Sequence, residues 1–124
     1  MLTKSKQPRK QRKARYNAPM HKRQKLLNAH ISKELRKKLK TAKRSITLRK
    51  GDKVKVLRGE HKKKEGKVTA VDLNNLKVYV EGIVDRRASG AEVQIALDPS
   101  NVMIIDGEFG NKDRETILGR SAKK

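Results

Sequence analysis

The chain has 124 residues, of which 34 are Lys or Arg and 13 are Asp or Glu, so its formal net charge is +21. This excess attracts phosphate-rich partners, and the absence of cysteine excludes disulfides and thiolate metal sites. No apolar run is long enough to span a membrane and the N-terminus lacks the apolar segment of a secretory signal, so we expect a cytoplasmic protein without membrane insertion.

The charge is concentrated in the first part of the chain. Residues 1–50 contain 19 Lys or Arg and one acid, Glu34, whereas residues 51–124 contain 15 Lys or Arg and 12 acids. We therefore expect a basic N-terminal extension followed by one small domain. With 34% hydrophobic residues and two Tyr and one Phe as its aromatic residues, the chain can bury only a small core.

Residues 1–16 are almost continuously polar, and Pro8 is expected to interrupt any early helix, so the sequence predicts a basic arm that is disordered when free. The arm is either a solvated tail that aids solubility or a segment that becomes ordered on RNA. We favour the second interpretation because arginine-rich disordered segments commonly fold on RNA. The candidate RNA contacts of the arm are Arg9, Lys10, Arg12, Lys13 and Arg15.

Residues 17–45 are predicted to form a basic helical extension. Asn17 and Pro19 suit the start of a first helix. Ser32 suits the N-cap of a second helix, and we expect a break between the two helices near His30.

The apolar residues of this extension recur every four positions, and we expect them to dock on the domain. They are Leu27, Ile31, Leu35 and Leu39. A run of charge on a helix is usually a solvated face, but here the bases have almost no acids to pair with, which favours phosphate contact. The candidate RNA contacts of the first helix are His21, Lys22, Arg23 and Lys25.

From residue 46 onward the apolar residues alternate with polar ones, which is typical of half-buried strands. The predicted strands are 46–48, 54–56, 68–71, 76–80, 93–97 and 102–105, with a longer loop at 81–91. Short strands separated by turns favour a small closed barrel, because closure removes the exposed edges.

A lysine-filled turn lies between Gly59 and Gly66. The strand before it buries valines on one face and offers lysines on the other, which suits a barrel that binds a polyanion; a solubilising hairpin tip is the open alternative. The candidate RNA contacts of the barrel are Arg49, Lys50, Arg58, His61, Lys62, Lys63, Lys64 and Lys67. Arg86 and Arg87, in the later loop, could contact RNA or equally face a protein neighbour.

Catalysis finds no support in the sequence. The histidines at positions 21, 30 and 61 lack metal-ligand spacing, and no serine or carboxylate pair has a partner pattern for catalysis. The glycines at 59 and 66 are too far apart for a nucleotide-phosphate loop. We therefore expect no enzymatic activity, no metal, no cofactor and no small-molecule substrate.

The segment GDKVKV at residues 51–56, continuing through Gly66-Lys67-Val68 to Val80, resembles a KOW motif, the RNA-binding half of an SH3-like barrel. Further segments resemble the same family in the same order; they are Asn17-Ala18-Pro19, Ser32-Lys33-Glu34-Leu35-Arg36, Ser89-Gly90-Ala91 and Pro99-Ser100-Asn101-Val102. Over residues 5–105 the chain is similar to the large-subunit ribosomal protein numbered twenty-four in bacteria and twenty-six in eukaryotes. The short tail favours the archaeal branch of this family.

The resemblance implies a mainly β fold, with an SH3-like barrel at residues 46–105, a KOW motif at about 51–80 and a C-terminal tail at 106–124. It also implies a structural role in the large ribosomal subunit, with direct binding to large-subunit rRNA near its 5′ region. Early subunit assembly, a place near the polypeptide exit tunnel and neighbouring large-subunit proteins as partners follow from the same resemblance. In the family the KOW glycine, here Gly66, occupies a backbone position that a side chain would crowd.

Two other classes of protein share some of these features. A transcription elongation factor can carry a KOW barrel, but normally behind a larger domain, which residues 1–45 could not form. A chromatin protein or general DNA-binding protein would also be basic. A preference for RNA over duplex DNA distinguishes that class from a ribosomal protein.

Overall fold

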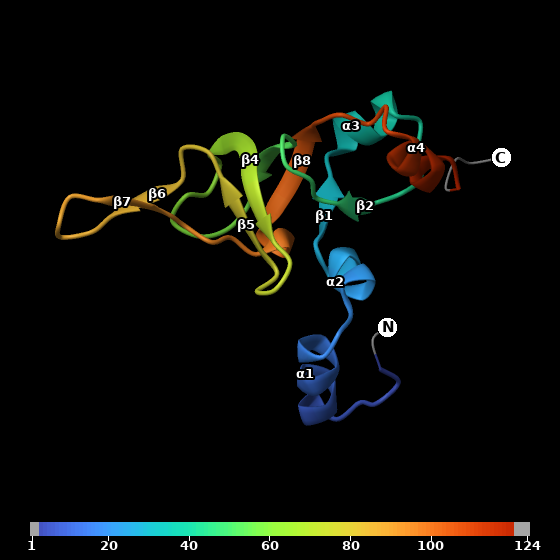
Figure 1. Ribbon diagram of the computed structural model, residues 1–124. Coiled ribbons are helices and arrows are strands. Elements are labelled where there is room, and N and C mark those ends of the chain that lie inside the picture. Colours follow the sequence, from blue (N-terminus) through green and yellow to red (C-terminus); the bar gives the residue numbers. More distant parts are fainter. Residues whose placement is uncertain (1–2, 121–124) are drawn as a thin grey trace.

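The computed structural model describes residues 3–120 and has a mainly β architecture, with a six-stranded sheet and a separate two-stranded hairpin (Figure 1). The helices of this part are α1 (Pro8–Tyr16), α2 (Met20–Leu26), α3 (Lys33–Lys38), the 3-10 turn η1 (Pro99–Asn101) and α4 (Lys112–Gly119). The strands are β1 (Asn28–Ile31), β2 (Ser45–Thr47), β3 (Lys53–Val56), β4 (Glu65–Asp72), β5 (Lys77–Val80), β6 (Val84–Arg86), β7 (Glu92–Gln94) and β8 (Val102–Asp106).

The strands of the sheet follow the order β2-β1-β8-β3-β4-β5. Neighbouring strands are antiparallel except β1 and β8, which run parallel. The predicted strands that correspond to β2, β3, β4, β5 and β8 are confirmed. Among the described residues no ladder joins the edge strands β2 and β5, so the predicted closed barrel is not confirmed.

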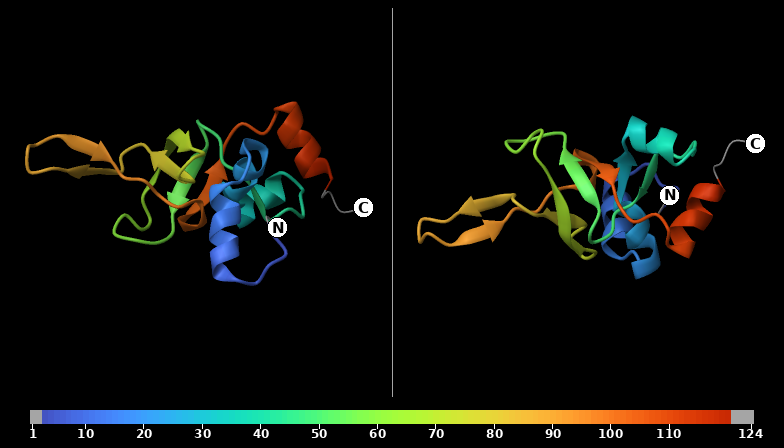
Figure 2. Two further views of the ribbon diagram at one scale, coloured as in Figure 1. Left: turned by 60° about the horizontal axis from the view of Figure 1, so that its bottom comes forward. Right: turned by 90° about the horizontal axis from the view of Figure 1, so that it is seen from above.

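The predicted loop at residues 81–91 is wrong in part, because it contains β6. This strand pairs with β7 in a hairpin that projects from the body (Figure 2). The chain then returns to the sheet, where Leu97 forms an isolated bridge with Val78 of β5. The predicted strand at 93–97 is therefore divided between two partners.

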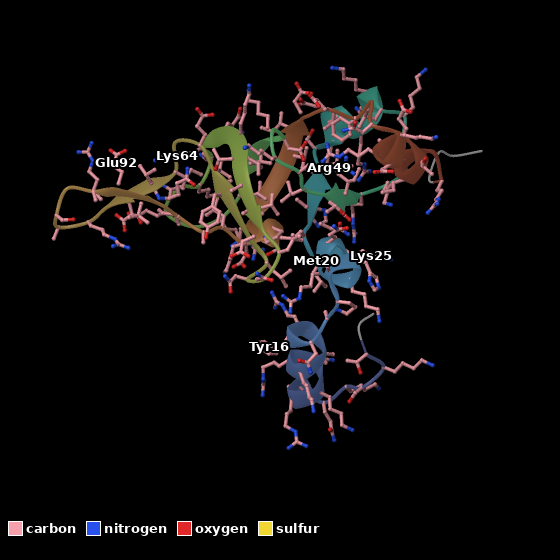
Figure 3. All side chains as sticks on the ribbon, viewed as in Figure 1. Tyr16, Met20, Lys25, Arg49, Lys64 and Glu92 are labelled. Atoms are coloured by element: carbon pink, nitrogen blue, oxygen red, sulfur yellow. The ribbon has the colours of Figure 1, made fainter. Side chains whose placement is uncertain are left out.

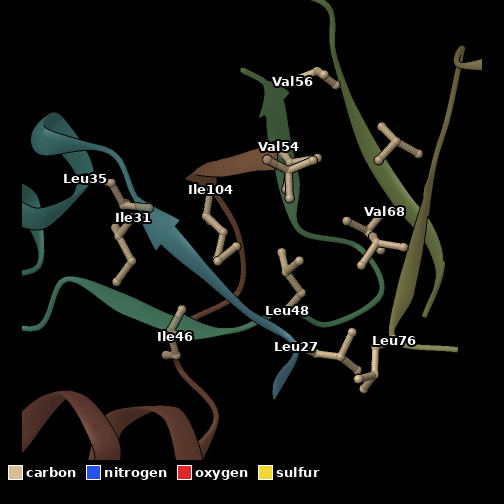
Figure 4. Close-up of a cluster of buried hydrophobic side chains, with 14 of the residues drawn as sticks. Leu27, Ile31, Leu35, Ile46, Leu48, Val54, Val56, Val68, Leu76 and Ile104 are labelled. Atoms are coloured by element: carbon tan, nitrogen blue, oxygen red, sulfur yellow. The ribbon is translucent and has the colours of Figure 1, made fainter. Parts of the chain in front are cut away.

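The core lies where the alternating aliphatic side chains of several strands face inward (Figure 4). In β3 the two valines are buried and the two lysines that alternate with them are not, because successive side chains of a strand point to opposite faces. The deeply buried side chains of the strands are Ala29, Ile46, Val54, Val56, Val68, Val78, Val80, Val102 and Ile104. Each fully buried aliphatic side chain contributes roughly 1.5–3 kcal/mol to stability.

The N-terminal extension also contributes to the core. Leu27, Ile31 and Leu35 are buried, and Leu39 packs against the same cluster, so these residues dock on the domain as predicted. They come from the end of α2, from β1 and from α3. The break expected near His30 is strand β1, which pairs with both β2 and β8.

The helix caps agree with the sequence in one place and differ in another. The Oγ of Ser32 accepts a hydrogen bond from the backbone N–H of Leu35 over 3.1 Å, which confirms the predicted N-cap of α3. Asn17 does not cap the next helix. It follows the last residue of α1, and α2 begins after Pro19 without a side-chain cap.

Residues 8–16 of the arm form α1 in the structure, and the disorder expected of the free arm stays a prediction. Pro8 begins this helix instead of interrupting it, since the first helical position needs no N–H partner and the fixed φ of proline suits it. None of the residues of α1 is buried. The helix therefore stands out from the body, joined to it by α2 (Figure 1).

The predicted C-terminal tail contains α4, which a buried ion pair attaches to the sheet. The side chains of Arg114 and Asp52 are each 2% exposed, and Nη1 and Nη2 of Arg114 donate to the two carboxylate oxygens over 2.8 and 2.6 Å. The guanidinium also donates to the carbonyls of Glu108 and Thr47. Its carbon Cζ lies 5.1 Å from the centre of the Phe109 ring. Arg114 thus joins α4 to the turn before β3.

Gly66 lies in β4 opposite Val54, and a side chain has no room there. A Cβ at this position would lie 2.5 Å from the carbonyl oxygen of Glu81 and 2.8 Å from Cγ1 of Val80. We expect Gly66→Val to lower the free energy of unfolding by about 3 kcal/mol, at the upper end of the usual cost of overpacking. Urea denaturation measures this loss.

Gly110→Ala is the matched control for this prediction, because a Cβ at Gly110 meets no atom within 4 Å. We expect the control to change the stability by only a few tenths of a kcal/mol. A Gly66→Val protein that unfolds at the same urea concentration as the control, with unchanged RNA affinity, would contradict the crowding at Gly66.

Candidate nucleic-acid interface

The cations of α1 are exposed and have no acidic partner among the described residues. Arg9, Lys10, Arg12, Lys13 and Arg15 are all solvent-exposed. Every ion pair found among residues 3–120 involves cations from Arg49 onward. The positive charge of the arm is therefore uncompensated within this part of the chain.

Arg23 of α2, one of the candidate RNA contacts, makes three hydrogen bonds within the protein. Its Nε donates to the carbonyl of Ala18 over 2.8 Å and its Nη2 to the carbonyl of Tyr16 over 2.5 Å. Its Nη1 donates to Oδ1 of Asn74, in the turn between β4 and β5, over 3.1 Å. Arg23 thus ties the arm and α2 to the sheet, while His21, Lys22 and Lys25 stay exposed.

The lysine-filled turn between β3 and β4 is closed by backbone hydrogen bonds. The N–H of Lys63 donates to the carbonyl of Val56 over 2.8 Å, and the N–H of Val56 to the carbonyl of Lys64 over 2.9 Å. Gly59 and Lys63 have positive φ values of 91° and 72°, which turn the chain sharply. The exposed cations of the turn and of the start of β4 are Arg58, Lys62, Lys63, Lys64 and Lys67.

His61 is half-buried in this turn, and its Nδ1 lies 3.1 Å from Nζ of Lys64. On the neighbouring strand, Lys53 and Lys55 both approach Glu65, with distances of 3.7 and 3.3 Å. One carboxylate therefore offsets charge at the base of the turn, and the lysines at its tip stay uncompensated within the described part of the chain.

The remaining candidates are divided between two places. Arg49 and Lys50 are exposed in the turn before β3, where Arg49 pairs with Asp113 over 3.4 Å. Arg86 pairs with Glu92 across the projecting hairpin over 3.2 Å, and Arg87 follows at its tip. These ion pairs compensate part of the charge at both places.

The structure does not gather all predicted contacts into one patch. Helix α1 lies on one side of the body and the β3–β4 turn on another, and Figure 3 shows Tyr16 and Lys64 well separated. Separate cationic groups on one small protein suit a partner that surrounds it, such as a large folded RNA.

A cleft that the sequence does not indicate opens between α1 and the β4–β5 turn. Its volume is about 590 Å³, and its lining is Arg12, Arg15, Tyr16, Arg23, Asn74, Asn75 and Leu76. Tyr16 is 81% exposed, the most exposed of the large hydrophobic side chains in the described part. In the sequence, the one indication of this cleft is an aromatic residue, Tyr16, among arginines.

The β4–β5 side of this cleft is held by Asp72. Its Oδ1 accepts from the backbone N–H groups of Asn74 and Asn75 over 2.8 and 3.1 Å, and its Oδ2 accepts from the Asn75 amide over 2.7 Å. The side-chain hydrogen bond of Asn75, followed by its backbone N–H, lowers the pKa of Asp72 below the ordinary value. The turn is therefore fixed by an ionised carboxylate.

Residues 3–120 contain neither a cluster suited to a metal ion nor a helix suited to cross a membrane. No group of three or more histidine, aspartate or glutamate side chains there has the arrangement to hold a metal ion. None of the helices in the same range is both long and apolar enough to cross a membrane.

Comparison with known proteins identifies related chains. A family model that describes the ribosomal proteins L26 of eukaryotes and their archaeal counterparts numbered twenty-four matches residues 5–121. The chain is 50% identical over 116 residues to the large ribosomal subunit protein uL24 of Methanothrix thermoacetophila, covering 94% of this chain and 98% of the relative. It is 53% identical over 114 residues to the large ribosomal subunit protein uL24 of Methanospirillum hungatei JF-1, covering 92% and 93%.

Proposed function

Since the chain belongs to the ribosomal protein family that comprises L26 of eukaryotes and its archaeal counterparts, we propose that it is a structural constituent of the large ribosomal subunit and binds large-subunit rRNA directly. Its relatives are named as large-subunit proteins. The observation that carries direct RNA binding is the uncompensated charge of α1 on a helix that buries none of its residues.

Such a helix gains no stability from the burial of its side chains. It has nine residues and no buried side chain, and isolated helices shorter than about 12–15 residues are marginal in water. Arg9, Arg12 and Lys13 are spaced three and four residues apart, so their charges repel one another on the helix surface. Contact with phosphates relieves this repulsion, which supports an anionic polymer as the partner of the arm.

The β3–β4 turn supplies the second proposed contact. Phosphate contacts from its lysines provide affinity and position the protein, whereas specificity for folded RNA comes from shape and unstacked bases. We infer that β3, β4 and β5 correspond to the KOW half of an SH3-like barrel. The antiparallel pairing of β3 with β4 and of β4 with β5 supports this correspondence.

The family relation supports the rest of the proposal. The protein acts in the cytoplasm by binding and not by catalysis, contacts the 5′ region of the large-subunit rRNA near the polypeptide exit tunnel and supports early subunit assembly. Its further partners are neighbouring large-subunit proteins, and the projecting β6–β7 hairpin is one surface that could meet them.

A sucrose gradient tests this function. The chain is tagged in its own cells, the lysate is washed at high salt, and the tag is followed through the gradient. We expect it to migrate with the large ribosomal subunit after the wash, because contacts with the shape and the unstacked bases of folded RNA persist when salt weakens the phosphate contacts. Sedimentation with RNA polymerase or with chromatin would contradict the ribosomal function and leave the fold unchanged.

A further inference from the structure

We propose that the cleft between α1 and the β4–β5 turn binds one unstacked nucleotide of the RNA, with Tyr16 as the stacking surface and Arg12 and Arg15 as phosphate contacts. The inference rests on the proposed rRNA binding and assigns a site within it. The remaining lining residues, Arg23, Asn74, Asn75 and Leu76, fix the shape of the cleft.

The exposure of Tyr16 is the first argument. The chain contains two Tyr and one Phe, and the other two rings, Tyr79 and Phe109, are partly buried in the body. Tyr16 is 81% exposed, at the end of α1 nearest the body (Figure 3). An exposed aromatic face beside arginines is the arrangement on which proteins stack the bases of single-stranded RNA.

The second argument is that hydrogen bonds hold the backbone at Tyr16 beside the β4–β5 turn. Its carbonyl accepts from Arg23, which is also bonded to Ala18 and to Asn74 across the cleft. The opposite wall is held by the three hydrogen bonds to Asp72. These hydrogen bonds keep the end of α1 beside the β4–β5 turn, so both walls of the cleft can contact one base.

Size and charge identify the class of ligand. The volume of about 590 Å³ lies within the range of ligand clefts. The lining residues include three arginines and no acid. Because Arg23 is engaged in three internal hydrogen bonds, Arg12 and Arg15 are the groups left to bind phosphate. A base with its own 5′- or 3′-phosphate matches one aromatic ring flanked by two guanidinium groups.

The test compares the full chain with three single variants, using a transcript of the 5′ part of the large-subunit rRNA of its own source. We expect Tyr16→Ala to weaken binding by about 5- to 150-fold, the range for loss of one stacked base. Tyr16→Phe should bind like the unmodified chain. The slope of log affinity against log salt should not change for either variant, since stacking releases no counterions.

Met20→Ala is the control, because Met20 is 55% exposed on the neighbouring helix and does not line the cleft. The Met20→Ala protein should bind the transcript normally.

If Tyr16→Ala binds as tightly as the unmodified chain, while that chain prefers the transcript to duplex DNA, the nucleotide site is refuted and the rRNA-binding function stands. If Tyr16→Ala and Tyr16→Phe lose the same affinity for the transcript, the hydroxyl group of Tyr16 makes the contact, and stacking on its ring is refuted. If the unmodified chain shows no preference for the transcript, the proposed function fails and the site with it.

Discussion

Removal of residues 1–16 is expected to flatten the dependence of log affinity on log salt by about four to five units, on the basis of about six phosphate contacts made by the arm. Each contact releases condensed counterions from the RNA, and their number sets the slope. The measurement is the dissociation constant of the full and the shortened chain for the rRNA transcript at several potassium chloride concentrations.

The shortened chain should fold normally, because α1 buries no residue. Lys112→Gln, at the start of the distant α4, serves as a control and should change the slope by at most about one unit. An unchanged slope after removal of the arm would show that α1 is a solvated tail and that the RNA contacts lie elsewhere.

Arg114→Ala is expected to lower the free energy of unfolding by about 3–5 kcal/mol, the usual cost of breaking a buried ion pair by removing one partner. The loss is large because the carboxylate of Asp52, 2% exposed, stays buried without its counter-ion. The same change deletes hydrogen bonds to the carbonyls of Glu108 and Thr47. Urea denaturation followed by circular dichroism measures the loss.

Asp113→Ala provides a matched control, because the Arg49–Asp113 pair joins the same two segments at the surface, with side-chain exposures of 43% and 80%. Exposed pairs contribute about 0–1 kcal/mol. The double variant Asp52→Ala, Arg114→Ala should lose less stability than the sum of the losses of the two single variants. In the double variant no charged side chain stays buried without its partner. Equal stabilities of Arg114→Ala and Asp113→Ala would contradict the role of the buried pair.

Five of the six strands of the sheet, β2, β3, β4, β5 and β8, could be predicted because apolar and polar residues alternate along them. Strand β1 could not, because Leu27, Ile31 and Leu35 are also spaced as on a helix. What makes residues 28–31 a strand is pairing with β2 and with β8, whose residues lie far away in the sequence. Tertiary contacts determine the conformation of this segment. The spacing of apolar residues along the sequence gives no information about these contacts.

The sequence does not predict helix α4, for a related reason. Its main anchor is the charged side chain of Arg114, which sequence rules place at the surface. Its burial depends on Asp52, 62 positions earlier, and on the carbonyls around it. Only the folded arrangement brings these groups together.

The cationic character of the candidate site could be predicted from the sequence, whereas the contacts among its residues could not. The exposed cations of α1 and of the β3–β4 turn lie on the surface, as expected for unpaired lysines and arginines. The internal hydrogen bonds of Arg23 could not be predicted from the sequence, because its partner Asn74 is 51 residues away. The same holds for the cleft beside Tyr16, which exists only because α2 holds α1 near the β4–β5 turn.

The position of β8 in the sheet also constrains how the protein forms. This strand lies between β1 and β3, although it follows all other strands in the chain. Strands β1 and β2 are joined to β3, β4 and β5 only through the ladders of β8, so the sheet cannot be completed without residues 102–106. Such long-range pairing slows folding. A chain interrupted before β8 would keep most of its cationic residues. It would lack the strand that joins β1 to β3, so the segment that carries α1 and the β3–β4 turn would no longer belong to one sheet.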